Sequence, residues 1–196
     1  MRLGLYGGSF NPIHIGHLLI AEFVKEEFFL DEIRFIPTAT PPHKRYDSIL
    51  SADKRFHMIK LAVRGNPSFR VSDIEIKRGG ISYTLDTLRQ ITGQLNKGDA
   101  LFWFIGMDNL IDFPNWHQPE EILKLCKLIV FARKGFEVED VEPHLREQVL
   151  FSEAPLIEIS SSTIRERVKK GLSICYFVPE PVRKYIQKYR LYLDEQ

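Results

Sequence analysis

Two histidines, His14 and His17, stand three residues apart, which places both imidazoles on one face of a helical first turn. Imidazoles that face a phosphate can donate hydrogen bonds to its oxygens and stabilise negative charge as it develops in a transition state. Gly16 stands between the two histidines in the chain and leaves the backbone there without a side chain. A lone histidine is usually a surface or core residue, but two that flank a glycine directly after an expected strand form a much rarer pattern. These residues therefore predict a site for phosphate chemistry.

The residues before the histidines are typical of a phosphate-binding turn. Gly7 and Gly8 follow the first expected strand, and glycine permits backbone angles and close approaches that a Cβ would block. Asn11 and Pro12 are expected to start the next helix, with Asn11 as the cap and Pro12 in the first turn. The amides and dipole of such a helix favour an anion. The turn has neither a Walker Gly-Lys-Ser/Thr nor the G-x-G-x-x-G spacing of dinucleotide-binding folds.

A cluster of hydroxyl groups marks the start of another helix near the far end of the chain. Thr163 and Glu166 match a capping box, while Ser162 could cap the helix one residue earlier. Arg165 falls within the first turn, where a cation opposes the helix dipole, and a bound phosphate would account for its presence. The alternative interpretation is a helix start without a ligand.

The elements that must position these groups alternate along the chain. This order indicates an α/β fold: a Rossmann-like, doubly wound, mainly parallel sheet with helices on both faces and a small C-terminal helical region. Ligands of such sheets bind beyond the carboxyl ends of the strands. We expect a single domain over residues 1–196, with a nucleotide-binding core over about 1–160, a helical part over about 161–196 and a surface excursion at 133–148. We expect strands at residues 2–6, 32–37, 69–77, 100–105, 128–131 and 156–159, and helices at 18–29, 52–63, 84–95, 162–170 and 181–190.

The composition is that of an ordinary globular protein. Of the 196 residues, 44% are hydrophobic and 27% charged, and the formal net charge of +1 argues against a broad nucleic-acid surface. No apolar run approaches the roughly 20 residues that span a bilayer, and the first residues do not resemble a signal peptide. Cys126 and Cys175 are isolated and are expected to be buried free thiols. We therefore expect a cytoplasmic protein with neither nucleic-acid nor membrane partners.

The glycine–histidine turn also carries a family resemblance. Residues 7–17, GGSFNPIHIGH, resemble the signature of the nucleotidyltransferase superfamily with an (H/T)xGH motif, and residues 159–166 resemble its ISxTxxR-type element. The tetrapeptide HIGH is also found in class I aminoacyl-tRNA synthetases, but this chain lacks their lysine-rich loop and is short for a synthetase. PPHK at 41–44, SYT at 82–84, GMDNL at 106–110 and FPNW at 113–116 resemble motifs of the bacterial nicotinate-mononucleotide adenylyltransferases, in the same order. Only residues 133–148 lack a counterpart.

The resemblance implies adenylyl transfer from ATP to nicotinate mononucleotide in NAD biosynthesis, with Mg²⁺ carried by ATP and no metal site formed by the protein. It implies catalytic roles for His14, His17, Lys44 and Arg165. ATP would contact Gly7, Gly8, Ser9, Phe10, His14, His17, Phe104, Ile105, Gly106, Ile159, Ser162 and Arg165. Nicotinate mononucleotide would contact Gly8, Ser9, Lys44, Ser82, Tyr83, Thr84, Asp108 and Trp116.

Several of these assignments have simpler alternatives. Lys44, in a proline-stiffened loop, can reach a triphosphate as a mobile charge, or it is a solvated lysine. Trp116 offers a flat face to a pyridine ring, or belongs to the core, and Asp108 could simply cap a helix. The acceptor could instead be nicotinamide mononucleotide or, with less support, phosphopantetheine. A nucleotide-binding regulator on the same fold is the non-enzymatic alternative, and homo-oligomerisation stays open.

Overall fold

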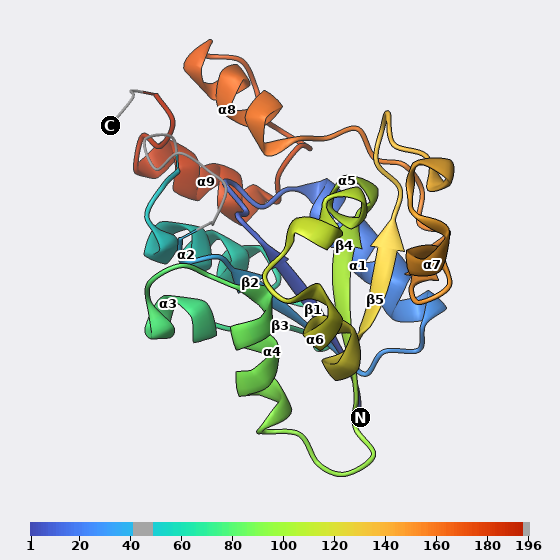
Figure 1. Ribbon diagram of the computed structural model, residues 1–196. Helices are drawn as coiled ribbons and strands as arrows, with labels where there is room; N and C mark the ends of the chain where they lie inside the picture. The colour runs from blue at the N-terminus through green and yellow to red at the C-terminus, as the bar shows by residue number, and fades with distance from the viewer. Residues whose placement is uncertain (41–48, 194–196) are drawn as a thin grey trace.

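The computed structural model describes residues 1–40 and 49–193, and within these ranges six strands form one sheet whose neighbouring pairs are all parallel (Figure 1). The strand order β3-β2-β1-β4-β5-β6 is that of a doubly wound α/β fold. The predicted fold class is therefore confirmed. The strands are β1 (Arg2–Gly8), β2 (Glu32–Pro37), β3 (Phe69–Val71), β4 (Ala100–Gly106), β5 (Lys127–Phe131) and β6 (Leu150–Phe151).

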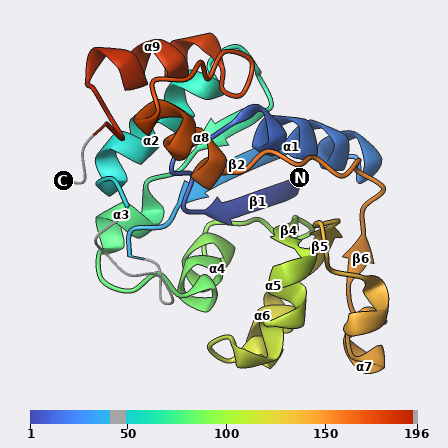
Figure 2. The same cartoon turned by 90° about the horizontal axis from the view of Figure 1, so that it is seen from above.

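Helices cover both faces of the sheet, as Figure 2 shows from above. The first face carries α1 (Ile15–Glu27), α2 (Ala52–Ala62), α8 (Ser161–Lys169) and α9 (Glu180–Lys188). The second carries α3 (Ile74–Arg78), α4 (Thr84–Thr92), α5 (Met107–Ile111), α6 (Pro119–Leu125) and α7 (Pro143–Arg146), with the 3-10 turns η2 (Phe113–Asn115) and η3 (Val138–Asp140). None of the helices in the described ranges is long and apolar enough to cross a bilayer.

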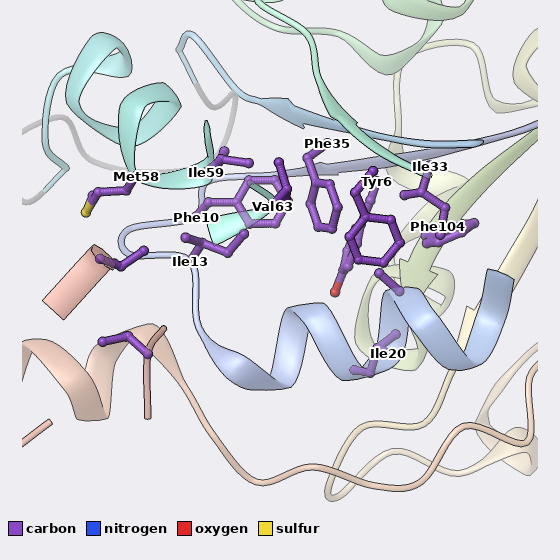
Figure 3. Close-up of a cluster of buried hydrophobic side chains, with 14 of the residues drawn as sticks. Tyr6, Phe10, Ile13, Ile20, Ile33, Phe35, Met58, Ile59, Val63 and Phe104 are labelled. Carbon is purple, nitrogen blue, oxygen red and sulfur yellow. The ribbon is translucent and has the colours of Figure 1, made fainter. Parts of the chain in front are cut away.

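The central strands bury side chains on both faces. Successive residues of a strand point to opposite sides, so Tyr6 of β1 packs toward α1 and Leu5 packs toward the second face. Figure 3 shows the first-face cluster, in which Tyr6, Phe10, Phe35 and Phe104 lie together. The rings of Tyr6 and Phe10 meet edge to face with centroids 5.5 Å apart. This aromatic packing anchors the turn that follows β1.

The strand predicted at residues 69–77 is wrong in its second half, where α3 replaces it. A strand would send Ile74 and Glu75 to opposite faces of the sheet, yet both side chains are buried on the second face. Ile74 joins the second-face core, and the Glu75 carboxylate accepts a hydrogen bond of 2.7 Å from the Thr87 hydroxyl. A helical turn lets both neighbours reach the same layer. Because Thr87 lies on α4, periodicity within the segment does not reveal this contact.

The last strand predicted at residues 156–159 is also wrong. The sheet ends at β6, and residues 152–160 form neither helix nor strand. Glu27, at the end of α1, accepts hydrogen bonds from the Ser152 hydroxyl at 2.5 Å and the Glu153 amide at 3.0 Å. These bonds hold the chain along the α1 side of the molecule (Figure 2), away from the edge of the sheet.

The remaining expectations differ from the structure in smaller ways. The five predicted helices agree with α1, α2, α4, α8 and α9 to within three residues at each end. Residues 133–148, expected to be a surface excursion, contain η3 and α7, and Val141 and Leu145 are buried in the second-face core. The elements α5, η2 and α6 escaped prediction because each is too short, at five, three and seven residues, to show a helical period.

Candidate functional site

The topology places a crevice at the carboxyl ends of β1 and β4. These strands are neighbours, but β1 leads to α1 on the first face, whereas β4 leads to α5 on the second. Such a reversal leaves a gap beyond the strand ends, where ligands of open α/β sheets bind. A cavity of about 890 Å³ opens at this point.

Nearly all the residues predicted from the sequence line this cavity. They come from three parts of the chain: Gly7, Gly8, Ser9, Phe10, His14 and His17 from the end of β1 to the start of α1; Phe104, Ile105, Gly106 and Asp108 from β4 and the start of α5; and Ser82, Tyr83, Thr84, Trp116, Ile159 and Ser162 from more distant segments. Arg165 does not line it. Lys44 and its neighbours 41–43 lie outside the described residues, so their assignment stays a prediction.

Helix α1 begins at Ile15 with His14 as its N-cap, rather than at Asn11 and Pro12 as predicted. The peptide between Asn11 and Pro12 is cis. The Asn11 side chain serves a tertiary contact instead of capping, because its Oδ1 accepts a hydrogen bond of 3.0 Å from the buried Tyr192 hydroxyl. The first residue of α1 therefore lies three residues after Pro12, and the two histidines occupy the N-cap and the first turn.

The imidazoles of His14 and His17 stack on each other, with centroids 3.6 Å apart and planes inclined by 27°. Burial lowers the pKa of His14 to about 3, with a smaller contribution from the positive charge of Arg133. Burial also lowers the pKa of His17 well below its usual range, and His14 and Arg133 add to the effect. Both rings are therefore neutral near pH 7 and act on a ligand as hydrogen-bond donors rather than as cations.

The tautomer of His17 follows from its hydrogen bond to the backbone. Its Nδ1 lies 3.2 Å from the His14 main-chain nitrogen, which donates the hydrogen bond. An accepting Nδ1 carries no proton in the neutral ring, so the proton of His17 is on Nε2. The hydrogen bond at the start of α1 thus fixes the ring of His17, which lines the cavity and has a single N–H donor, at Nε2.

Helix α8 begins one residue earlier than predicted, and a different residue caps it. Ser160 has extended backbone angles and its Oγ accepts a hydrogen bond of 3.1 Å from the Thr163 amide. The predicted caps, Ser162 alone or Thr163 with Glu166, are therefore wrong. Because Ser160 takes this role, Ser162 lies inside the first turn and on the wall of the cavity.

Arg165 connects the two sequence motifs directly. Its guanidinium donates a hydrogen bond of 2.9 Å to the main-chain carbonyl of Asn11 and one of 3.3 Å to the Ser162 hydroxyl. Ser161 adds a parallel link, since its hydroxyl donates to the Pro12 carbonyl at 2.8 Å. The start of α8 is thus fastened to the turn before α1, and Arg165 stands just behind the cavity wall.

Sequence reasoning missed Arg133, a cation that lines the cavity. Its Nε lies 3.7 Å from Asp108 Oδ1, and its Cζ is 5.1 Å above the ring of Phe131. Within the described ranges this buried Nε has no hydrogen-bond partner. Arg133 follows the carboxyl end of β5 closely, so the rule that ligands bind beyond strand ends could have found it.

The far wall of the cavity is aromatic. The ring centroids of Tyr83 and His117 lie 4.6 Å apart, and those of Trp116 and Phe113 lie 5.4 Å apart. Trp116 is half-buried: it packs against the second-face core and also lines the cavity. Glu75, also missed, is buried in the wall, and burial raises the pKa of its carboxyl group. This wall offers flat surfaces for a planar ring next to a polar turn.

Comparison with known proteins agrees with this geometry. The family model described as cytidylyltransferase-like matches residues 5–167. A protein of Salinibacter ruber named "Probable nicotinate-nucleotide adenylyltransferase" is 43% identical over 192 residues, which cover 98% of each chain. One of the same name from Dehalococcoides mccartyi is 42% identical over 198 residues, covering 98% of this chain and 97% of its own.

Solved structures share the fold. The nicotinic acid mononucleotide adenylyltransferase of Plasmodium falciparum, in complex with NaAD, superposes with a TM-score of 0.78 at 20% identity over 97% of both chains. A putative nicotinate-nucleotide adenylyltransferase of Vibrio parahaemolyticus superposes with a TM-score of 0.73 at 17% identity over 98% of this chain and 96% of its own. By its sequence relatives and its family model, the chain belongs to the cytidylyltransferase-like nucleotidyltransferases and, among them, to the nicotinate-nucleotide adenylyltransferase family.

Proposed function

We propose that this protein is a nicotinate-nucleotide adenylyltransferase that makes deamido-NAD and pyrophosphate from ATP and nicotinate mononucleotide. The observation that carries the proposal is the stacked pair His14 and His17 at the start of α1, on the wall of the same cavity as Tyr83 and Trp116. One wall thus offers donors for phosphate oxygens and the other offers flat faces for a pyridine ring. The relatives that cover nearly the full chain carry the name of this activity.

The reaction is an in-line displacement at the α-phosphorus of ATP. An oxygen of the 5′-phosphate of nicotinate mononucleotide attacks, the new P–O bond forms, and the bond to the β-phosphate oxygen breaks, so that its electron pair leaves with pyrophosphate. The attacking group is already an anion and needs no general base. The task of the protein is therefore to position both substrates and to stabilise charge.

We propose one role for each of the phosphate-binding residues. His17 would donate a hydrogen bond from its Nε2–H to an α-phosphate oxygen, and this bond would be strongest in the transition state. His14 would contact the neighbouring oxygens. Arg165 and Lys44 would neutralise the β- and γ-phosphates, with a hydrogen bond from Ser162. Arg165 would have to exchange its present contact with the Asn11 carbonyl for one with phosphate.

The other assignments divide the cavity between adenosine and the acceptor. Phe104, Ile105, Gly106 and Ile159 would line the adenosine side, and Gly7, Gly8, Ser9 and Phe10 would approach the phosphates. Ser82, Tyr83 and Thr84 would hold the nicotinate carboxylate, Trp116 would cover the pyridine ring and Asp108 would bind a ribose.

Mg²⁺ would enter with ATP, because phosphate oxygens and water are the ligands it prefers. Within the described ranges, no three His, Cys, Asp or Glu side chains form a group that could hold a metal. The ion, when bound to the triphosphate, reduces the charge on the leaving pyrophosphate. Location in the cytoplasm also stays a proposal, supported by two free cysteines, Cys126 buried and Cys175 half-buried.

Pyrophosphate release tests the proposal. The protein is mixed with ATP and Mg²⁺ and, in separate reactions, nicotinate mononucleotide, nicotinamide mononucleotide or phosphopantetheine, and the dinucleotide product is identified by mass. We expect the fastest release with nicotinate mononucleotide. Faster release with another acceptor would overturn the substrate assignment, and no release with any acceptor would favour a nucleotide-binding regulator.

A further inference from the structure

Arg55, on α2, is a buried cation that the reaction scheme above does not use. Its side chain is among the largest fully buried ones, with the residue 1% exposed. The guanidinium donates to the carbonyl oxygens of Leu50 at 2.9 Å, Ser9 at 2.8 Å and Thr38 at 2.6 Å, with a longer contact to that of Ala39 at 3.4 Å. Burial of a charge is unfavourable unless its hydrogen bonds are satisfied. In the part of the chain that the structure describes, all the acceptors of the guanidinium are main-chain carbonyls of loops.

Two of these loops form the cavity. Ser9 follows β1 and Thr38 follows β2, and both line the cavity, whereas Arg55 itself does not. The loops also touch each other, because the Thr38 amide donates a hydrogen bond of 3.0 Å to the Gly8 carbonyl. Arg55 therefore connects the loop at Ser9 with the loop at Thr38 by hydrogen bonds, from a position outside the cavity that both loops line.

Each carbonyl held by Arg55 also fixes the direction of an amide. In a trans peptide the C=O and N–H bonds point to opposite sides. The Ser9 carbonyl points at Arg55, so the amide of Phe10 points away from it. Within residues 1–40 and 49–193 the structure shows no acceptor for that amide. Phe10 lines the cavity together with both histidines, and the centroid of its ring lies 5.0 Å from that of His17. We therefore expect this amide to donate to a phosphate bound there.

The backbone at Phe10 needs such support. Its φ of 46° lies in the left-handed region, which is unfavourable for a bulky aromatic residue and persists only where the surroundings enforce it. Phe10 is only 3% exposed, and its ring packs into the aromatic cluster of Figure 3, which holds the side chain. Arg55 holds the main chain of the same residue, because it binds the carbonyl of the Ser9–Phe10 peptide.

The second peptide leads to the acceptor side of the cavity. The Thr38 carbonyl points at Arg55, and the amide of the same peptide, that of Ala39, donates a hydrogen bond of 3.0 Å to the Ser82 hydroxyl. The Ser82 amide in turn donates to the Thr40 carbonyl at 3.0 Å. Ser82 precedes Tyr83 and Thr84, so this chain of contacts connects Arg55 to the turn assigned to the nicotinate group.

We propose that Arg55 is a positioning residue: it orients the Ser9–Phe10 peptide toward the ATP phosphates and, through the Thr38–Ala39 peptide and Ser82, the turn that binds the acceptor. The proposal rests on the proposed function for the identity of the substrates. Lysine could keep the charge but presents three donors on a single nitrogen, whereas arginine spreads five over a planar fork. Arg55→Lys should therefore fold and still misplace the loops.

The matched control is Met58→Ala. Met58 is fully buried on the same helix, in the core beneath α2, and lies in the first-face cluster without lining the cavity. Met58→Ala should lower the Tm by about as much as Arg55→Lys. It should leave kcat and the KM values for both substrates within about threefold of the wild-type values. Arg55→Lys should lower kcat/KM by about 10²-fold, the scale for a misplacement of about 1 Å, and weaken the affinity for ATP measured without acceptor.

Arg55→Ala gives a second readout. Millimolar guanidinium should restore part of its activity by occupying the vacated space, and should not affect Met58→Ala. If Arg55→Ala does not fold, Arg55→Lys against Met58→Ala decides alone. The proposal is overturned if Arg55→Lys keeps kcat/KM and ATP affinity within threefold of wild type, or if Met58→Ala loses as much at equal Tm. ATP affinity, measured by calorimetry, remains informative even if the wild-type protein turns over a different acceptor.

Discussion

The main-chain N–H of His14 donates a hydrogen bond of 3.2 Å to Nδ1 of His17, and the two imidazoles stack with centroids 3.6 Å apart. This pairing holds the His17 ring in one orientation and leaves its proton on Nε2. A preorganised neutral donor is well suited to a phosphate whose charge shifts during the reaction, because the donor does not have to reorient as the charge develops.

Replacement of His17 by alanine should therefore impair the chemical step. We expect kcat to fall by about 10²-fold or more, the scale for the loss of one transition-state donor, with an unchanged circular dichroism spectrum. His144→Ala, on the surface helix α7, is the control and should retain full activity. Near-wild-type turnover by His17→Ala would remove this residue from the mechanism.

The low pKa of His14 predicts how stability depends on pH. Burial holds its folded pKa near 3, whereas an unfolded histidine titrates near about 6.5. Below about 6.5 the unfolded chain binds a proton that the folded site refuses, so the free energy of unfolding should fall as the pH drops toward about 3, by up to about 1.4 kcal/mol per pH unit. Above that range this group should have no effect.

Urea unfolding between pH 4 and pH 8 measures this dependence. His14→Asn removes the titrating group, so its stability should fall less steeply below pH 6.5 than that of the wild type. Parallel curves for the two proteins would show that His14 titrates normally in the folded state.

Arg165 should contribute to ATP binding through its charge and its fork of donors. Arg165→Met removes both, and the loss of hydrogen bonds to a charged group should weaken ATP binding by roughly 10- to 100-fold. Lys170→Met, at the exposed C-terminal end of the same helix, changes the net charge equally and should have little effect. Isothermal titration with ATP and Mg²⁺ compares them; equal affinities would contradict the assignment of Arg165.

Trp116 should act on the acceptor and not on ATP. Loss of stacking on one ring in Trp116→Ala should raise the KM for nicotinate mononucleotide by roughly 10-fold, while the KM for ATP changes little. Trp116→Phe keeps a flat ring beside Phe113 and should lose less. Steady-state kinetics with each substrate varied in turn would contradict this role if both KM values rose together.

Gly7 should be intolerant of any side chain for a steric reason. A Cβ at this position would overlap the indole of Trp103 in β4. Both groups belong to central strands, so Gly7→Ala should destabilise the fold by about 1–3 kcal/mol, the usual range for overpacking. Gly65→Ala is the control, since a Cβ there meets nothing within 4 Å. Thermal unfolding should show a lower Tm for Gly7→Ala alone; equal Tm values would mean that the indole moves aside.

Much of the fold could be predicted because its central signals are local. The apolar runs of β1, β4 and β5 and the helical periodicity of α1, α2 and α4 are properties of short segments, and strand–helix alternation then leads to a parallel sheet. The predictions failed at residues 69–77 and 156–159. In the first case the Glu75 carboxylate contacts Thr87 on another helix; in the second, Ser152, which precedes residues 156–159, contacts Glu27, 125 residues away. Neither contact can be seen in the local sequence pattern.

The sequence by itself determined the chemistry of the site: a glycine turn, two histidines three residues apart and an arginine at a helix start are readable without coordinates. Only the tertiary structure decided how these groups are held, because hydrogen bonds and charges act over a few ångströms, whatever their separation in the chain. The burial of His17 against His14, which lowers the pKa of His17, is one example. The contact of Arg165 with Asn11, 154 residues away, and the placement of Arg55 behind Ser9 and Thr38 are others, since each depends on segments that meet only when the sheet has formed.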